Sequence, residues 1–126
     1  MRHQVSGYKL SRSKDQRIAL KRIMIKQLFT HERIQTTTAK AHAIRGEAEK
    51  LITLAKNSAE SSDIEKVNAR RLAAAKLGGS PEVVKKLFDD IGLRYKNRAG
   101  GYTRIYRLGL RQGDASEMVM LELVEE

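Results

Sequence analysis

A single apolar stripe in residues 38–56 constrains the fold of this chain more than any other feature of the sequence. Its members recur at intervals of three and four residues, the spacing of one face of an α-helix. They are Ala41, Ile44, Ala48, Leu51, Ile52 and Ala55. Charged side chains such as Arg45 and Glu49 fall on the opposite face, and Thr37 or Thr38 is placed to cap the helix start. A helix of this kind buries one side, so other elements must pack against it.

The segment before this helix has a second helical pattern, over residues 16 to 30, with Asp15 as its predicted N-cap. Two apolar ridges run along it, the first formed by Ile18, Ile25 and Phe29 and the second by Leu20, Met24 and Leu28. Lysines and arginines lie on both flanks of these ridges. The pattern predicts a helix that touches the core with one part of its surface and an anion with another.

Two more helices are predicted after a polar connection. Asp63 is the predicted cap of an alanine-rich helix that closes at Gly78-Gly79, because glycine readily takes the left-handed backbone conformation that ends helices. Ser80-Pro81 then has the composition of an N-cap and first turn, which predicts a helix to about Asp90.

The remaining segments are predicted as strands. Residues 33–37 form a short β-branched strand, residues 93–101 a basic loop, and residues 102–110 and 118–124 an antiparallel pair. The order helix, strand, three helices, two strands indicates an α+β fold of two layers, with helices on one face of a small sheet. We expect one α/β domain over residues 14–126, preceded by a basic N-terminal extension, residues 1–13.

Positive charge is concentrated in two segments of the chain, whose formal net charge is +10. Residues 1–33 hold nine Lys and Arg against two acids, and residues 94–111 hold six Lys and Arg with no acid. The other 75 residues carry a net charge of −3. A uniformly basic surface fits this segregation poorly, whereas two faces for a polyanion fit it well.

The two segments supply the candidate RNA-binding residues. Arginine can bind a phosphate with two N–H groups, tyrosine can stack on an unpaired base, and glycine lets backbone N–H groups approach a phosphate. The N-terminal candidates are Arg2, His3, Tyr8, Lys9, Arg12, Lys14, Arg17, Lys21, Arg22 and Lys26. The second set is Arg94, Lys96, Arg98, Gly100, Gly101, Tyr102, Arg104, Arg107 and Arg111. For Tyr102 and Tyr106, a role in strand formation is an equally good interpretation.

No catalytic constellation is visible in the sequence. There is no Cys, and none of the three histidines has a partner at metal-ligand spacing. Asp89 and Asp90 are adjacent, so on a helix their side chains point about 100° apart. Phosphate-binding glycine loops are missing. We therefore expect neither an enzyme nor a cofactor, metal or small-molecule substrate. No segment approaches the roughly 18 apolar residues that span a bilayer, so a soluble, intracellular protein without membrane contact is expected.

Two long motifs carry a resemblance to a known family. Residues 34–37 (Ile-Gln-Thr-Thr), Lys40-Ala41 and residues 51–56 (Leu-Ile-Thr-Leu-Ala-Lys) form the first, and residues 97–105 (Asn-Arg-Ala-Gly-Gly-Tyr-Thr-Arg-Ile) form the second. Together with the Met-Arg-His start and the Glu-Leu-Val near the end, they resemble the family of the seventeenth protein of the bacterial large ribosomal subunit. The resemblance implies a two-layer α/β fold and binding to large-subunit ribosomal RNA. It also implies a cytoplasmic, ribosome-bound position near the polypeptide exit region, beside neighbouring large-subunit proteins.

The sequence thus predicts a structural constituent of the large ribosomal subunit that binds ribosomal RNA through two basic surfaces. Two alternatives stand beside it. A DNA-binding architectural protein is disfavoured because no recognition-helix motif is visible and the cations are spread over tail, helix, loop and strand. An RNA-processing enzyme is disfavoured because no acid, base or metal constellation exists.

Overall fold

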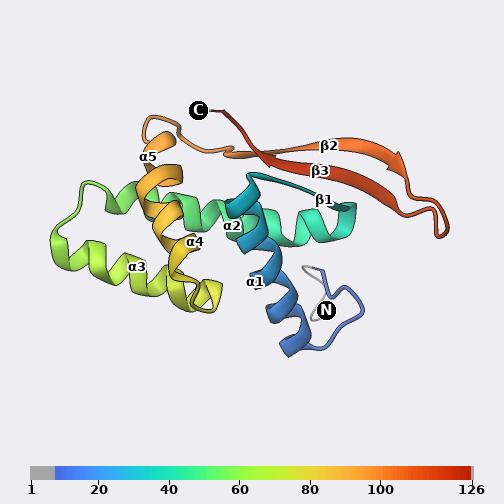
Figure 1. Cartoon of the computed structure of the whole chain (residues 1–126), viewed down its shortest axis with the longest axis horizontal. Helices are drawn as coiled ribbons and strands as arrows, with labels where there is room; N and C mark the ends of the chain where they lie inside the picture. The colour runs from blue at the N-terminus through green and yellow to red at the C-terminus, as the bar shows by residue number, and fades with distance from the viewer. Residues whose placement is uncertain (1–7, 126) are drawn as a thin grey trace, which may run out of the picture.

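The computed structural model describes residues 8–125. Over this range the chain forms a helix, a strand, a series of helices and a final pair of strands, as the sequence predicts (Figure 1). The three segments α4, η1 and α5 follow one another without a break and correspond to one predicted helix. The elements are α1 (Lys14–His31), β1 (Arg33–Thr37), α2 (Thr38–Ser58), α3 (Asp63–Leu77), α4 (Pro81–Lys86), the π-helical turn η1 (Leu87–Ile91), α5 (Gly92–Arg94), β2 (Thr103–Leu110) and β3 (Glu117–Leu123). The predicted α+β class is confirmed.

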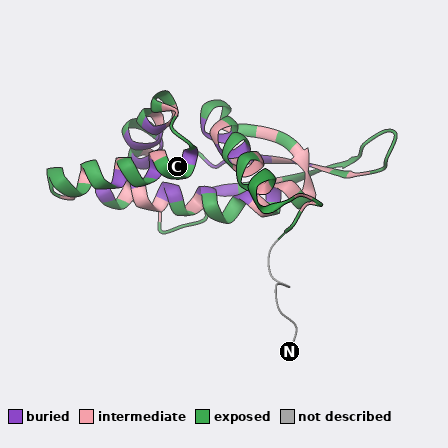
Figure 2. Ribbon diagram, turned by 90° about the horizontal axis from the view of Figure 1, so that it is seen from below, coloured by how far each residue is buried: buried purple, intermediate pink, exposed green. Residues whose placement is uncertain are grey.

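The sheet is antiparallel with the strand order β1-β3-β2, so the last strand lies in the middle. Leu121 of β3 pairs with Ile34 on one side and Ile105 on the other. Val119, Leu121 and Leu123 are buried, because alternate residues of β3 face the helical layer. The far end of the β2–β3 hairpin projects beyond the helices and is largely exposed (Figures 1 and 2).

Helix α2 lies at the centre of the core. All six positions of the apolar stripe in residues 38–56 are buried, as predicted. They pack in one cluster with the buried faces of α1, α3 and η1, where the fully buried side chains include Leu28, Phe29, Leu77, Leu87 and Ile91. Burial of an aliphatic side chain contributes about 1.5–3 kcal/mol, so this cluster fixes how α1, α2 and α3 lie against one another.

Two of the predicted helix caps are wrong by one or two residues. Ser13, not Asp15, caps α1, and its hydroxyl accepts from the backbone N–H of Gln16 in a capping box. Ser62, not Asp63, caps α3. Both aspartates instead lie in the first helical turn, where a carboxylate interacts favourably with the helix dipole. Thr37 caps α2, and it is one of the two threonines predicted for this role.

The predicted helix end near Asp90 is wrong as well, because the helix continues through Gly92 to Arg94. Gly92 is buried against α2, and a Cβ atom at this position would lie 3.1 Å from the Cβ of Ala55. The glycine therefore permits a close helix–helix approach and does not terminate the helix. As a consequence, Arg94 belongs to a helix and not to the basic loop.

Candidate nucleic-acid interface

Except for Arg33 at the start of β1, the described cations of the first basic segment lie on and just before α1. We call this set the N-terminal basic surface; it comprises Lys9, Arg12, Lys14, Arg17, Lys21, Arg22 and Lys26. The end of the extension is tied to the helix by arginine side chains, since Arg12 donates to the carbonyl of Leu10 at 2.8 Å and Arg17 donates to the carbonyl of Arg12 at 2.9 Å. Arg2 and His3, also predicted for this surface, lie outside the described residues.

Most of these cations keep their positive charge uncompensated. Within residues 8–125, Lys14, Arg17, Arg22 and Lys26 have no carboxylate within 4 Å, whereas Lys21 pairs with Glu47 at 3.3 Å. Arg22 reaches the backbone carbonyl of Ala75 on α3 and so leaves its charge unneutralised. An array of neighbouring, uncompensated cations attracts a polyanion at long range and binds its phosphates at short range.

The second basic segment differs, because the fold brings acids to its cations. Among residues 8–125, these cations include five with a carboxylate within ion-pair distance. These pairs are Arg94 with Glu32 and Asp90, Lys96 with Glu60, Arg104 with Glu122, Arg107 with Glu117, and Arg111 with Asp114. We call residues 94–111 the loop–strand surface. Its charge is largely balanced in three dimensions, although the segment contains no acid of its own.

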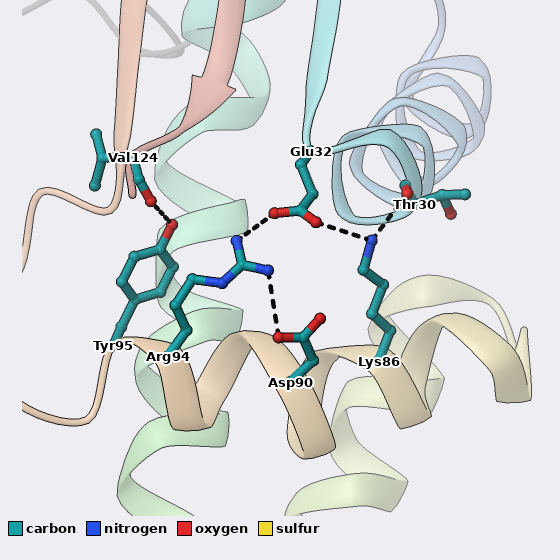
Figure 3. A network of polar contacts seen from close by, with 7 residues as sticks. All are labelled: Thr30, Glu32, Lys86, Asp90, Arg94, Tyr95 and Val124. Carbon is teal, nitrogen blue, oxygen red and sulfur yellow. Dashed lines mark hydrogen bonds and ion pairs between the residues drawn. The ribbon is translucent and has the colours of Figure 1, made fainter. Parts of the chain in front are cut away.

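Arg94 belongs to an internal network, shown in Figure 3. Its guanidinium binds Glu32 at the junction of α1 and β1 and also lies 3.3 Å from Asp90. Lys86 approaches the same Glu32 carboxylate at 3.4 Å and donates to the carbonyl of Thr30 at 2.9 Å. Hydrogen bonding from Arg94 lowers the pKa of Glu32, and this bond in turn raises the pKa of Arg94. The network joins the α4–η1–α5 helix to the end of α1, so Arg94 is committed to the fold.

Two of the four tyrosines are core residues. Tyr95 and Tyr102 are buried and contact each other, with ring centroids 5.2 Å apart. The hydroxyl of Tyr95 donates to the carbonyl of Val124 (Figure 3), and burial raises the pKa of this phenol. The hydroxyl of Tyr102 meets that of Thr53 at 3.3 Å. The Tyr102 ring is therefore buried between α2 and the sheet end, and a contact of Tyr102 with RNA stays a prediction.

The other two tyrosines remain accessible. Tyr8 lies at the start of the described chain, where its ring stacks beside His42 of α2 with centroids 6.3 Å apart. Tyr106 lies on β2, and the guanidinium of Arg104 covers its ring at 5.2 Å from the centroid. Both rings are 46% exposed, so either one can present a face to an unpaired base.

The glycine pair of the loop–strand surface is exposed, as its predicted role requires. Gly101 has φ +61°, a conformation that favours glycine. Arg98 turns back on this loop, where its Nε lies 3.1 Å from the carbonyl oxygens of both Gly100 and Gly101. Lys56 of α2 donates to the carbonyl of Arg98 and holds the loop against the helix. The loop is thus a fixed, exposed turn and not a free segment.

The structure adds two cations that the sequence prediction missed. Lys50 of α2 and Lys76 of α3 line the same hollow as Lys14, Arg17, Lys21 and Arg22 of the N-terminal basic surface. Lys50 has Glu47 and Glu49 close by in the sequence, and Lys76 lies outside both of the basic segments defined by the distribution of charge. Only the packing of α2 and α3 beside α1 brings them to this surface.

The described part of the chain offers neither a metal-ion site nor a membrane-spanning helix. Within residues 8–125 there is no group of three or more His, Asp or Glu placed to hold a metal ion. No helix in this range is long and apolar enough to cross a membrane.

Comparison with known proteins identifies the class. The family model described as ribosomal protein L17 matches residues 20–124. The protein named large ribosomal subunit protein bL17 of Trichlorobacter lovleyi is 51% identical over 126 residues, which cover 100% of this chain and 95% of that protein. The proteins of the same name from Pelobacter propionicus and Magnetococcus marinus are 49% and 46% identical and are covered over 93% and 94% of their lengths.

These matches define a structural protein of the ribosome and not an enzyme. The chain belongs to the ribosomal protein L17 family, and the resemblance drawn from its sequence motifs is confirmed. Membership makes it a structural constituent of the large ribosomal subunit.

Proposed function

We propose that this chain binds and stabilises large-subunit ribosomal RNA through two basic surfaces of unequal strength. The observation that supports the stronger one is the set of α1 cations, Lys14, Arg17, Arg22 and Lys26, with no carboxylate within 4 Å among residues 8–125. Each phosphate that such a cation neutralises releases condensed counterions from the RNA. Neutralisation by a rigid helix allows RNA segments that would repel one another to pack side by side.

The loop–strand surface takes the weaker part in this proposal. Arg104 and Arg107 are paired with Glu122 and Glu117, yet their side chains are 51% and 86% exposed. A guanidinium has five N–H donors, so an arginine that holds one carboxylate still has donors for a phosphate. Binding there gains hydrogen bonds but little net charge neutralisation. Phosphate and sugar contacts should dominate on both surfaces, with base contacts confined to unpaired nucleotides.

The division of the chain follows from the same reasoning. Residues 1–13, of which residues 1–7 lie outside the described range, act as the basic N-terminal extension, and residues 14–126 act as the RNA-binding domain. Among the described residues, regular structure begins at Lys14, and Tyr8 and Lys9 are exposed. A position near the polypeptide exit region beside other large-subunit proteins, in the cytoplasm, is proposed on the family resemblance alone.

Salt-dependent binding to a large-subunit RNA fragment tests the proposal. If roughly six to ten phosphates are neutralised, affinity should fall on the order of 10³–10⁵-fold between 50 and 200 mM salt. A DNA duplex of the same length is the control for general polyanion binding, and the RNA should be preferred at every salt concentration. Equal affinity for both would favour a DNA-binding architectural protein, and a flat salt profile would contradict an electrostatic interface.

A further inference from the structure

A hollow of about 760 Å³ lies between α1, α2 and α3 beside the N-terminal basic surface. Its floor is aliphatic, and among the residues that line it none is aromatic. Side chains from all three helices form this floor: Ile18, Ile25, Leu51, Leu54 and Leu72. Ile18 and Leu72 are 40% and 51% exposed, so apolar surface faces solvent in the hollow. The volume is within the range of about 300–1,000 Å³ typical of pockets for organic groups.

The rim of the hollow is strongly positive. Six of the lining side chains are cations, four from α1 together with Lys50 of α2 and Lys76 of α3. Glu47 is the one carboxylate among the lining residues, and Lys21 holds it at 3.3 Å. An occupant must therefore combine an apolar group that fits the floor with negative charge on both sides of it.

We propose that this hollow holds an unpaired nucleotide of RNA, with its base against the aliphatic floor and its flanking phosphates on the cationic rim. This inference rests on the proposed RNA-binding function and gives it a specific ligand. A paired duplex offers phosphates to the rim, but its bases stay stacked and do not reach the floor. An unpaired nucleotide carries both required features in one unit, because every base has an apolar face and every linkage an anionic oxygen.

Charge complementarity on both sides of the floor favours RNA over a protein segment. The cations that line the hollow come from all three helices, which matches a backbone with a charge at each repeat. An acidic amphipathic helix would need carboxylates along both of its edges to do the same. Such a helix is the alternative occupant, and a crosslink from the hollow to a protein would indicate it.

Photo-crosslinking within the assembled subunit tests the occupant directly. The change is Leu72→p-benzoylphenylalanine, with Ile64→p-benzoylphenylalanine as the matched control. Both residues are exposed aliphatics of α3, but Ile64 is 75% exposed and does not line the hollow. We expect position 72 to crosslink to a single-stranded nucleotide of the large-subunit RNA, and position 64 not to crosslink to that nucleotide. A crosslink from position 72 to a protein, to paired RNA or to nothing would overturn the inference.

A binding measurement separates this inference from general RNA binding. The probes are an RNA hairpin with a bulged 2-aminopurine and the same hairpin fully paired. Leu72→Ser should weaken binding to the bulged RNA on the order of tenfold and leave the paired RNA within about twofold, because only the bulged base reaches the floor. Ile64→Ser should change neither, and the 2-aminopurine fluorescence should change when the wild-type protein binds.

The outcomes of this measurement are distinguishable. If both RNAs bind equally and Leu72→Ser changes neither, the hollow does not hold a base, and RNA binding through the rim cations stands. If neither RNA binds at low salt, the proposed function and this inference fail together. Because Leu72 is half exposed, the serine variant should fold within about 0.5 kcal/mol of wild type, which a melting curve checks.

Discussion

A matched pair of double variants tests whether the N-terminal basic surface binds RNA more strongly than the loop–strand surface, as the difference in their ion pairs indicates. Lys14→Gln with Arg17→Gln removes two cations that have no carboxylate partner among residues 8–125, whereas Arg104→Gln with Arg107→Gln removes two that are paired with Glu122 and Glu117. Each double variant lowers the formal net charge of +10 by two. Long-range attraction therefore falls equally, and only the local contacts differ.

The expected magnitude follows from counterion release. Each phosphate neutralised on a duplex contributes about 0.9 to the steepness with which log affinity falls with log salt concentration. If Lys14 and Arg17 each neutralise one phosphate, their loss therefore makes this slope shallower by about 1.8. At 0.1 M salt this change corresponds to a loss of roughly 60-fold in affinity. Because Arg104 and Arg107 are already neutralised by carboxylates, their removal should cost less than about fivefold and leave the slope nearly unchanged.

The assay is equilibrium binding to a large-subunit RNA fragment at several salt concentrations, with melting curves for both variants. The folding control matters because Arg17 also donates to the carbonyl of Arg12 at 2.9 Å, a hydrogen bond that contributes about 0.5–1.5 kcal/mol. An equal or larger loss from the Arg104 and Arg107 variant, with both proteins folded, would refute the argument. It would mean that paired arginines bind RNA as strongly as the cations of α1.

Three further predictions concern the fold that carries these surfaces. Glu32→Gln should lower stability by about 1 kcal/mol at pH 7. The folded state lowers the pKa of Glu32, so the stabilisation by its carboxylate is fully present above the ordinary pKa of 4.5. It disappears as the pH falls through the lowered pKa of the folded state, and urea unfolding at several pH values checks this. Gly92→Ala should lower the free energy of unfolding by about 1–3 kcal/mol in the same assay, because the new Cβ would lie 3.1 Å from the Cβ of Ala55. An unchanged urea midpoint would show that α2 can shift to make room for the methyl group. Ser13→Ala should cost about 1 kcal/mol by removing the cap of α1, and faster amide exchange in the first turn of α1 would report it.

The parts of the fold that sequence patterns predict well are those fixed by local spacing. The apolar stripe of α2 is buried at every predicted position, because the 3.6-residue period alone decides which side chains share a face. The strands of the sheet begin and end within one residue of their predicted limits. The caps at Ser13 and Ser62 were missed because an aspartate lies within two residues of each serine, and either residue type can cap a helix.

The continuation of the helix through Gly92 and the burial of Tyr102 could not be predicted for a different reason, since both depend on contacts between distant segments. Glycine commonly ends a helix, but at residue 92 the neighbouring Ala55 of α2 leaves no room for a larger residue. Tyr102 follows a basic loop in sequence, yet its ring lies between α2 and the sheet end, where its hydroxyl meets Thr53. A local pattern contains no information about either neighbour.

The charge of the loop–strand surface shows the same dependence on distant contacts, with a consequence for function. In the β2–β3 hairpin, Arg104 lies opposite Glu122 and pairs with it directly across the ladder. An acid-free run in the sequence thus becomes a set of ion pairs, because β3 supplies Glu122 and Glu117 and other parts of the fold supply Glu32, Glu60, Asp90 and Asp114. The opposite happens beside α1, where α2 and α3 contribute Lys50 and Lys76 and add to a positive field that the sequence already indicated. The folded chain therefore concentrates its uncompensated charge on the helical layer, and that layer is where RNA contacts should be sought first.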